Sequence, residues 1–337
     1  MILKYRTIFF IFPLFLSFSA AVFGGSNEAA LLNVSYNSTT ELYKEYNEAF
    51  AKYWKTKTGQ DVTIHQTHGD SAKQAQYVME GLEADVATLS VSSDIDAISQ
   101  KAGLLSHHWQ SRLPHNSNPY TSTVVFLVRK GNPKDIKDWD DLIKPGISIV
   151  TPNPKTSGTA RWNFLAVWGY AYKKYGTETA ARDFASRFYK NVRVLNTRSR
   201  GALTFFAQLG VGDVLVTWEN EAYQAVEDFP NGHFEVITPS LSVLAEPSVA
   251  WIDRNTEKHG TTELAKAYLK HLYSREGQSL IVKHHFRPTD KRALRKYSDK
   301  FPSMEMFTIE DLFGGWKKAE ATYFADGGIF DQVYAGH

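Results

Sequence analysis

The sequence predicts an α/β protein of two lobes with a ligand cleft between them. Short apolar runs alternate with amphipathic patterns of helical period, as strands alternate with helices in α/β proteins. Two extended segments, residues 120–128 and 236–252, interrupt this alternation and are placed to cross between lobes. No linker rich in Gly and Ser separates independent domains, which favours lobes joined by ordered hinge strands.

The division of the chain follows from these crossing segments. We expect residues 27–119 plus 244–337 to form the first lobe and residues 120–243 to form the second lobe. The helical pattern at residues 308–313 is expected to pack back on the first lobe. About 310 residues follow the first 25, which suits two hydrophobic cores better than one.

Residues 1–25 have the pattern of a secretory signal peptide. Lys4 and Arg6 precede an apolar run over residues 8–18, and small residues such as Ala20 and Gly24 follow. The run is too short to span a bilayer comfortably, so an uncleaved anchor is the less favoured alternative. We therefore expect a soluble mature protein outside the cytoplasm.

The composition excludes several classes of protein. The chain has 38 Lys and Arg against 36 Asp and Glu, and removal of Lys4 and Arg6 makes the mature chain formally neutral. This balance argues against a nucleic-acid surface, and no later apolar stretch is long enough for a membrane span. The chain contains no Cys, so disulfides and a lipid-modified N-terminal Cys are excluded.

Four apolar runs are each followed by a polar turn and a helical pattern. Capping-box patterns at residues 38–41 and 71–74 are expected to start two of the helices, and Ser157 and Ser199 the other two. In open α/β sheets, ligands bind beyond the carboxyl ends of the strands, where these turns lie. Ser and Thr are also commonplace helix caps without any ligand. The four runs are residues 31–36, 62–66, 147–150 and 192–195.

Residues 153–161, Asn-Pro-Lys-Thr-Ser-Gly-Thr-Ala-Arg, predict an anion site. They contain no acidic residue and connect a strand to a helix. A helix N-terminus directs free N–H groups and partial positive charge toward one point, which favours an oxyanion. An oxyanion without a proton offers only acceptors, so its site needs donors and no carboxylate facing it. The turn at Ser157, Gly158 and Thr159 meets this requirement.

Three further side chains are candidates with a plainer alternative. Trp218 ends the apolar run 214–217, and its indole N–H is a donor with no acceptor role; the alternative is a half-buried core aromatic. Arg161 and Arg200 lie one turn into their helices, where they could orient the anion-binding turns. The alternative for both is an ordinary surface ion pair.

Catalysis finds little support in the sequence. No Gly-x-Ser-x-Gly elbow, dinucleotide loop or phosphate loop occurs, and no His pair has the spacing of a zinc site. We therefore expect a protein that is not an enzyme and needs no metal or cofactor. A secreted hydrolase with the same α/β pattern is the remaining alternative.

Residues 153–161 also resemble the N-P-K-[ST]-S-G-x-A-R signature of the prokaryotic sulfate-binding protein family. The resemblance extends over essentially the whole mature chain. It implies a type II periplasmic binding protein, the receptor of a sulfate/thiosulfate ABC importer, with two α/β lobes that close on one desolvated sulfate. Further matching stretches lie at residues 31–36, 120–134, 212–221, 244–247 and 313–316.

The resemblance also implies a set of ligand contacts. The hydroxyl of Ser157 and the indole N–H of Trp218 would donate to the anion, and main-chain N–H groups would complete the set. The main-chain donors would belong to Asn37, Ser71, Gly158, Thr159 and Ser199.

Several positions depart from the family pattern. Asn37 stands where Asp is familiar, Thr67 where Ser is familiar, and Thr159 and Ser199 replace smaller residues; main-chain donors survive such changes. Asp70, where Gly is common, would repel an anion, so its side chain is expected to point outward or to cap its helix.

The predicted function is therefore capture of sulfate in the periplasm by a monomeric receptor. Its partners would be the permease subunits of an ABC importer in the inner membrane. Thiosulfate is the nearest alternative ligand, and molybdate and phosphate come after it. Because sulfate carries no proton near neutral pH, we expect its affinity to be nearly independent of pH.

Overall fold

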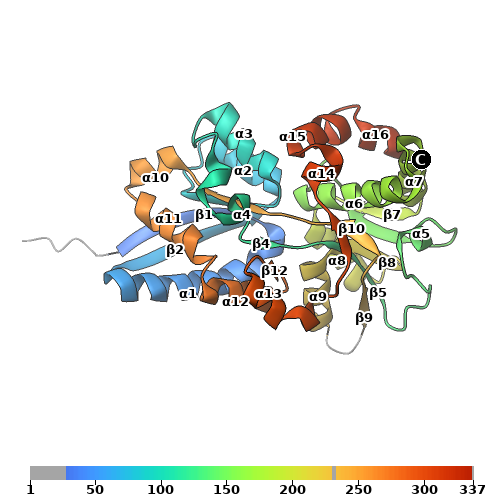
Figure 1. Ribbon diagram of the computed structural model, residues 1–337, viewed down its shortest axis with the longest axis horizontal. Coiled ribbons are helices and arrows are strands. Elements are labelled where there is room, and N and C mark those ends of the chain that lie inside the picture. Colours follow the sequence, from blue (N-terminus) through green and yellow to red (C-terminus); the bar gives the residue numbers. More distant parts are fainter. Residues whose placement is uncertain (1–27, 230–232, 336–337) are drawn as a thin grey trace, which may run out of the picture.

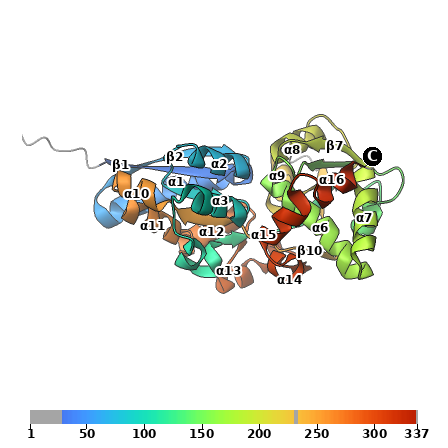
Figure 2. The same cartoon turned by 90° about the horizontal axis from the view of Figure 1, so that it is seen from above.

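The computed structural model describes residues 28–229 and 233–335, and two mixed sheets organise these residues. The predicted signal peptide lies outside them. Each sheet has its own helices, and the two groups of elements stand side by side in both views (Figures 1 and 2). No helix in the described ranges is long and apolar enough to cross a membrane. The fold is the predicted α/β fold of two lobes.

The first sheet has the strand order β11-β3-β1-β2. Its strands β1, β2 and β3 are parallel, and β11 runs antiparallel to β3. The carboxyl ends of β1 and β2 therefore lie together and lead into helices at one edge. The strands are β1 (Glu28–Tyr36), β2 (Asp61–Gly69), β3 (Val86–Leu89) and β11 (Ser248–Trp251), and the helices around them are α1 (Thr40–Thr58), α2 (Ser71–Met79), α3 (Ser92–Ala102), α10 (Asp253–His259), α11 (Thr262–His271) and α12 (Arg275–Lys283).

The second sheet has the strand order β7-β6-β8-β5-β9. β6 is parallel to β7 and β8, whereas β5 is antiparallel to β8 and β9. Its strands are β5 (Val124–Arg129), β6 (Ile149–Pro152), β7 (Val192–Asn196), β8 (Val214–Trp218) and β9 (Phe234–Ile237), and its helices are α5 (Trp139–Leu142), α6 (Gly158–Tyr175), α7 (Glu178–Lys190), α8 (Ser199–Ala207) and α9 (Glu219–Asp228).

Short pairings join the two sheets. β4 (Tyr120–Thr121) pairs with β12 (Arg287–Pro288), and Ser122 forms a bridge with Ala245. β10 (Leu241–Val243) pairs with β13 (Glu305–Phe307). Both predicted crossing segments therefore take part in ordered pairings. The remaining elements are η1 (Asn37–Thr39), η2 (Trp109–Arg112), α4 (Pro114–Ser117), α13 (Lys291–Lys296), η3 (Ser298–Lys300), α14 (Ile309–Phe313), α15 (Trp316–Ala319), η4 (Glu320–Phe324) and α16 (Ile329–Tyr334).

Helix α6 is covered on almost every side. Every residue from Gly158 to Ala171 is buried except Arg161, as expected for a helix that is apolar all round. The rings of Tyr323, Phe324 and Phe330 pack against Phe164 of this helix. Elements α14, α15 and α16 thus lie over α6 and α7 (Figure 1).

This packing corrects the expected position of the chain end. Residues 308–313 were expected on the first lobe, but Phe313 packs with Phe307 and Tyr323, and the Phe307 ring reaches Gly169 of α6. A helix as apolar as α6 needs a cover, and the aromatic residues of the C-terminal segment provide it. The lobe boundaries 27–119 plus 244–337 and 120–243 stay a prediction, and these contacts argue for moving the last 30 or so residues to the second lobe.

Two expected helix starts are also wrong in detail. α1 begins at Thr40 after the short turn η1, and its N-cap residue Thr39 makes no side-chain cap. α2 begins at Ser71, and the side chain that caps it belongs to Asp70. Asp70 takes this place because its carboxylate, one position earlier, reaches the free N–H of Ala72.

Candidate anion-binding site

Four helix starts meet at one small cavity between the sheets. These are the N-termini of η1 and α2 from the first sheet and of α6 and α8 from the second sheet. Five of the seven predicted contact residues line the cavity: Asn37, Ser71, Ser157, Thr159 and Ser199. The other lining residues are Tyr36, Ser38, Gly69, Asp70, Ser90 and Arg198. The topology therefore brings together turns that are far apart in the sequence.

Three hydroxyl groups from α6 and α8 form a cluster at the cavity. Ser157 Oγ lies 2.9 Å from Thr159 Oγ1 and 3.5 Å from Ser199 Oγ, and Thr159 Oγ1 contacts Ser199 Oγ. Ser157 occupies the N-cap position of α6, but its hydroxyl does not cap the helix. The hydroxyl is therefore directed toward the other two, where it can rotate to donate to an anion.

Asp70 faces the anion turn. Its Oδ1 accepts a hydrogen bond from the N–H of Ala72 at 3.1 Å, so the expected capping role is confirmed. Its Oδ2 accepts from the N–H of Gly158 at 3.2 Å, so the side chain does not point outward. Burial raises the pKa of Asp70, and the hydrogen bond from Gly158 opposes that shift. One of the predicted anion donors is thus engaged by a carboxylate of the protein itself.

A charged Asp70 would oppose a dianion strongly. Two unit charges 4 Å apart interact by about 4 kcal/mol at an effective dielectric constant near 20, so a dianion would be repelled by about 8 kcal/mol. A site for such a ligand needs this carboxyl group to move away or to be neutral.

Trp218 lies behind the cavity rather than in its lining. Its side chain is fully buried, and the indole N–H donates to the carbonyl oxygen of Thr159 at 3.2 Å. Its ring packs against Tyr36 and Trp162, with ring centres 5.8 and 6.2 Å away. Trp218 therefore braces the anion turn here, and its role as a direct ligand contact stays a prediction.

Ser90 is a cavity residue that the sequence pattern did not single out. It follows β3 directly, and its main-chain N–H donates to Ser71 Oγ at 3.1 Å. Its own Oγ is buried and has no hydrogen-bond partner among the described residues. A Cβ on Gly158 would lie 2.5 Å from this Oγ, so Gly158 leaves just the space that the Ser90 hydroxyl needs. The pattern that could have identified Ser90 is the one seen at the other turns: an apolar strand followed directly by Ser.

The two arginines predicted to support the turns take different places. Arg161 Nη1 lies 2.7 Å from Glu320 Oε1 and 3.7 Å from Asp94 Oδ1, so it links α6 to α3 and to the C-terminal segment. Arg200 lines a neighbouring pocket, and Arg198 lines the anion cavity instead.

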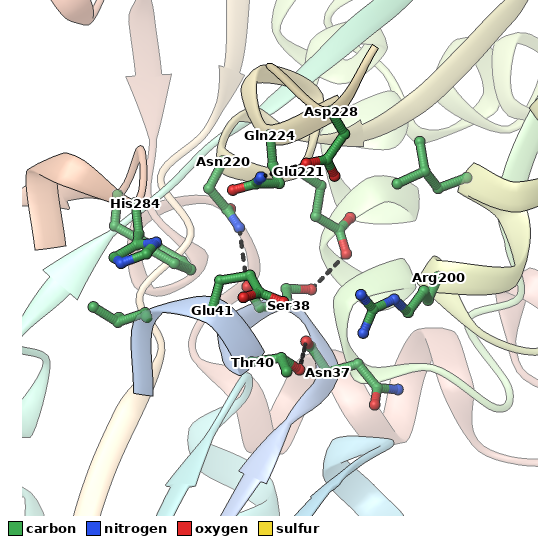
Figure 3. A pocket seen from close by; sticks show the side chains of 13 residues that line it. Asn37, Ser38, Thr40, Glu41, Arg200, Asn220, Glu221, Gln224, Asp228 and His284 are labelled. Atoms are coloured by element: carbon green, nitrogen blue, oxygen red, sulfur yellow. Dashed lines mark hydrogen bonds between the residues drawn. The ribbon is translucent and has the colours of Figure 1, made fainter. Parts of the chain in front are cut away.

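The neighbouring pocket is more acidic and does not suit an anion. Its lining includes Glu41, Glu221 and Asp228 against the single arginine Arg200 (Figure 3). Glu221 accepts hydrogen bonds from Ser38 at 2.6 Å and from Thr217 at 2.5 Å, and burial raises its pKa. The smaller cavity, where hydroxyl and N–H donors predominate, is therefore the better candidate for an anion site.

Asp94 leads to a prediction about pH. Burial raises its pKa to about 7, and the nearby Arg161 opposes that shift. The folded protein therefore keeps a proton that the unfolded chain releases near pH 4, so the free energy of unfolding should fall as pH rises from about 4 to 7. Urea unfolding at several pH values checks this, and Asp94→Asn should flatten the slope. An identical slope in the variant would contradict the assignment to Asp94.

Comparisons with known proteins agree with this arrangement. Residues 31–287 match the family model of the bacterial extracellular solute-binding proteins. The sulfate-binding protein of Escherichia coli K12 is 53% identical over 91% of this chain and 94% of its own, and the thiosulfate-binding protein of Pseudomonas aeruginosa is 49% identical over 93% and 95%. The solved structure of the sulfate-binding protein SubI from Mycobacterium tuberculosis superimposes with a TM-score of 0.79 at 32% identity, covering 87% of this chain and 98% of SubI.

Proposed function

The chain belongs to the bacterial extracellular solute-binding proteins, and from this premise we propose that it is a periplasmic receptor for sulfate. It captures one anion in the cavity between its lobes and delivers it to the permease subunits of an ABC importer. No bond is made or broken. The lobes close around the anion because only the closed arrangement brings the donors of both sheets to it.

The observation that carries this proposal is the meeting of four helix starts at one small cavity between the sheets. Main-chain N–H groups and the hydroxyl cluster of Ser157, Thr159 and Ser199 supply donors there without a mobile counter-charge. Helix N-termini stabilise an oxyanion through their aligned peptide dipoles. The names of the two similar bacterial receptors point to sulfate or thiosulfate as that anion.

Titration calorimetry tests the proposal directly. We expect one sulfate per monomer, no product from ester substrates, and weaker binding of thiosulfate, molybdate and phosphate. Binding of thiosulfate more tightly than sulfate would favour the second candidate, a thiosulfate receptor of the same importer type. Turnover of an ester would favour a hydrolase instead.

Replacement of Trp218 by Phe tests the support of the anion turn. The variant keeps the aromatic body, but it removes the indole N–H that donates to the Thr159 carbonyl oxygen, so the anion turn loses this support from behind. We expect sulfate binding to weaken by about 1–3 kcal/mol, as for a hydrogen bond near a charged group. Trp54→Phe is a matched control, because its indole donates to Gln60 far from the cavity. Equal sulfate affinity in Trp218→Phe and in the wild type would exclude this role.

A further inference from the structure

We propose that Asp70 couples anion binding to the uptake of one proton, so that the receptor binds sulfate more tightly as the pH falls. This inference rests on the proposed function and changes one expectation from the sequence, that sulfate affinity is nearly independent of pH. It makes Asp70 the residue that sets how the site responds to pH and to the charge of its ligand.

The first observation is the position of the Asp70 carboxylate. Its Oδ1 is held by the N–H of Ala72 at the start of α2, which fixes the side chain at the rim of the cavity. Its Oδ2 takes the N–H of Gly158 on the opposite lobe, one of the donors that the anion would use. The carboxylate therefore competes with the ligand both for this donor and for the space at the cavity.

Protonation removes the competition for the Gly158 donor and the charge repulsion without moving the side chain. When the proton is on Oδ2, this oxygen becomes a donor and a weaker acceptor, so the N–H of Gly158 is freed for the anion. The same O–H then faces the anion and adds one donor to the set. At pH 7, a carboxyl group with an ordinary pKa near 4 is protonated in only about one molecule in a thousand. A raised pKa makes the protonated form more common and its formation less costly.

The surroundings of Asp70 favour the neutral form once a dianion is present. Burial already raises its pKa, and the opposing influences are the hydrogen bond from Gly158 and the charge of Arg161. Arg161 is itself paired with Glu320 and lies near Asp94, so much of its charge is balanced. The anion would remove the Gly158 hydrogen bond from Asp70 and add negative charge, and both changes raise the pKa further.

Other titratable groups lie around the same cavity and must be separated from Asp70. Asp94 on α3 is buried with a raised pKa, His68 on β2 has a pKa lowered by burial, and Arg198 lines the cavity. Asp70 hydrogen-bonds the N–H of Gly158, a predicted anion donor, whereas Glu320 and Asp94 face Arg161, and Asp94 also contacts the side chain rather than the N–H of Ser71. The competition for the ligand therefore belongs to Asp70 among the described groups.

The test is titration calorimetry with sulfate between pH 5.5 and 9, in buffers with different ionisation enthalpies. We expect uptake of up to one proton per sulfate at the alkaline end and an affinity that falls toward tenfold for each pH unit. Asp70→Asn should keep the helix cap and mimic the neutral carboxyl group. The variant should bind sulfate at least as tightly as the wild type at pH 8, with no proton uptake.

Two control variants separate Asp70 from its neighbours. Asp290→Asn alters a carboxylate that caps α13 in the same way but lies away from the cavity, and it should leave both affinity and proton uptake unchanged. Asp94→Asn should retain the proton uptake. Loss of uptake in Asp94→Asn with retention in Asp70→Asn would assign the proton to Asp94 and overturn the inference.

The remaining outcomes distinguish this inference from the proposed function. Sulfate binding that does not change with pH in the wild type would overturn the role of Asp70 and leave the receptor function intact. Absence of sulfate binding at every pH, in both the wild type and Asp70→Asn, would overturn the function itself. Tighter binding of hydrogen phosphate than of sulfate at pH 8, without proton uptake, would show that Asp70 acts as a charged acceptor and would overturn both.

Discussion

Gly158→Ala is expected to weaken sulfate binding at least a hundredfold while leaving the protein folded. The added Cβ would lie 2.5 Å from Ser90 Oγ, closer than real Cβ atoms come to their neighbours, and 3.0 Å from Ser71 Cβ, which is tighter than most real contacts. These neighbours belong to the opposite lobe, so the clash is relieved when the lobes stay apart. A hundredfold loss corresponds to about 2.8 kcal/mol. Calorimetry with sulfate measures it.

Stability and rescue measurements complete this experiment. Ala is a better helix former than Gly, so thermal unfolding of Gly158→Ala should shift little or upward. Removing the nearer neighbour in the double variant Gly158→Ala, Ser90→Gly should recover part of the affinity. Gly176→Ala, at the C-cap of the same helix, has nothing near its Cβ but a φ of +79° that strains Ala, so it should lower stability and leave sulfate affinity unchanged. Wild-type affinity in Gly158→Ala would exclude closure of the lobes over this residue.

Glu219→Gln is expected to destabilise the protein by about 3–5 kcal/mol. Arg287 Nε and Nη2 lie 2.6 and 2.8 Å from the two carboxylate oxygens of Glu219, and the two side chains are 8% and 0% exposed. Loss of one partner leaves a buried charge without its counter-charge, which is the costly way to break such a pair. Urea unfolding measures the loss in the free energy of unfolding, and the m-value should be unchanged.

Two further variants show whether burial causes this effect. Lys55 and Asp61 form an exposed pair at 2.7 Å, with exposures of 60% and 58%, so Asp61→Asn should cost less than about 1 kcal/mol. Replacing both buried partners, as in Glu219→Leu with Arg287→Met, should cost less than Glu219→Gln alone. A loss of stability in Glu219→Gln as small as that in Asp61→Asn would contradict the stabilising role of the buried pair of Glu219 and Arg287.

The sequence predicted the parts of the fold that depend on local patterns. The apolar run and polar turn around residues 147–161 specify β6, the anion turn and α6, because periodicity and helix-start chemistry are local properties. The neighbouring positions of Asn37 and Ser71, and of Ser157 and Ser199, also followed, since adjacent parallel strands carry their helix starts to one edge. The meeting of the two pairs depends on how the lobes face each other and was implied by the family resemblance.

The features that escaped prediction depend on contacts between distant segments. Asp70 was expected to cap its helix, and it does, but its second oxygen meets Gly158 across the cavity, which no local pattern encodes. Ser90 differs from other Ser residues only through its position behind Gly158. The chain end packs on α6 because Phe164 and Trp168 need a cover. Which segment covers them is decided only when the second lobe is assembled, so no local pattern predicts it.

The cover of α6 has a consequence for the order of assembly during synthesis. A chain made from its N-terminus completes the anion turn at residues 157–159 long before the segment around Tyr323, Phe324 and Phe330. Until that last segment is present, the helix that carries the turn has an uncovered aromatic face, and no packing on that face holds it in position. A nascent or truncated chain should thus be unable to hold a ligand at this turn, and binding competence becomes a mark of a complete chain.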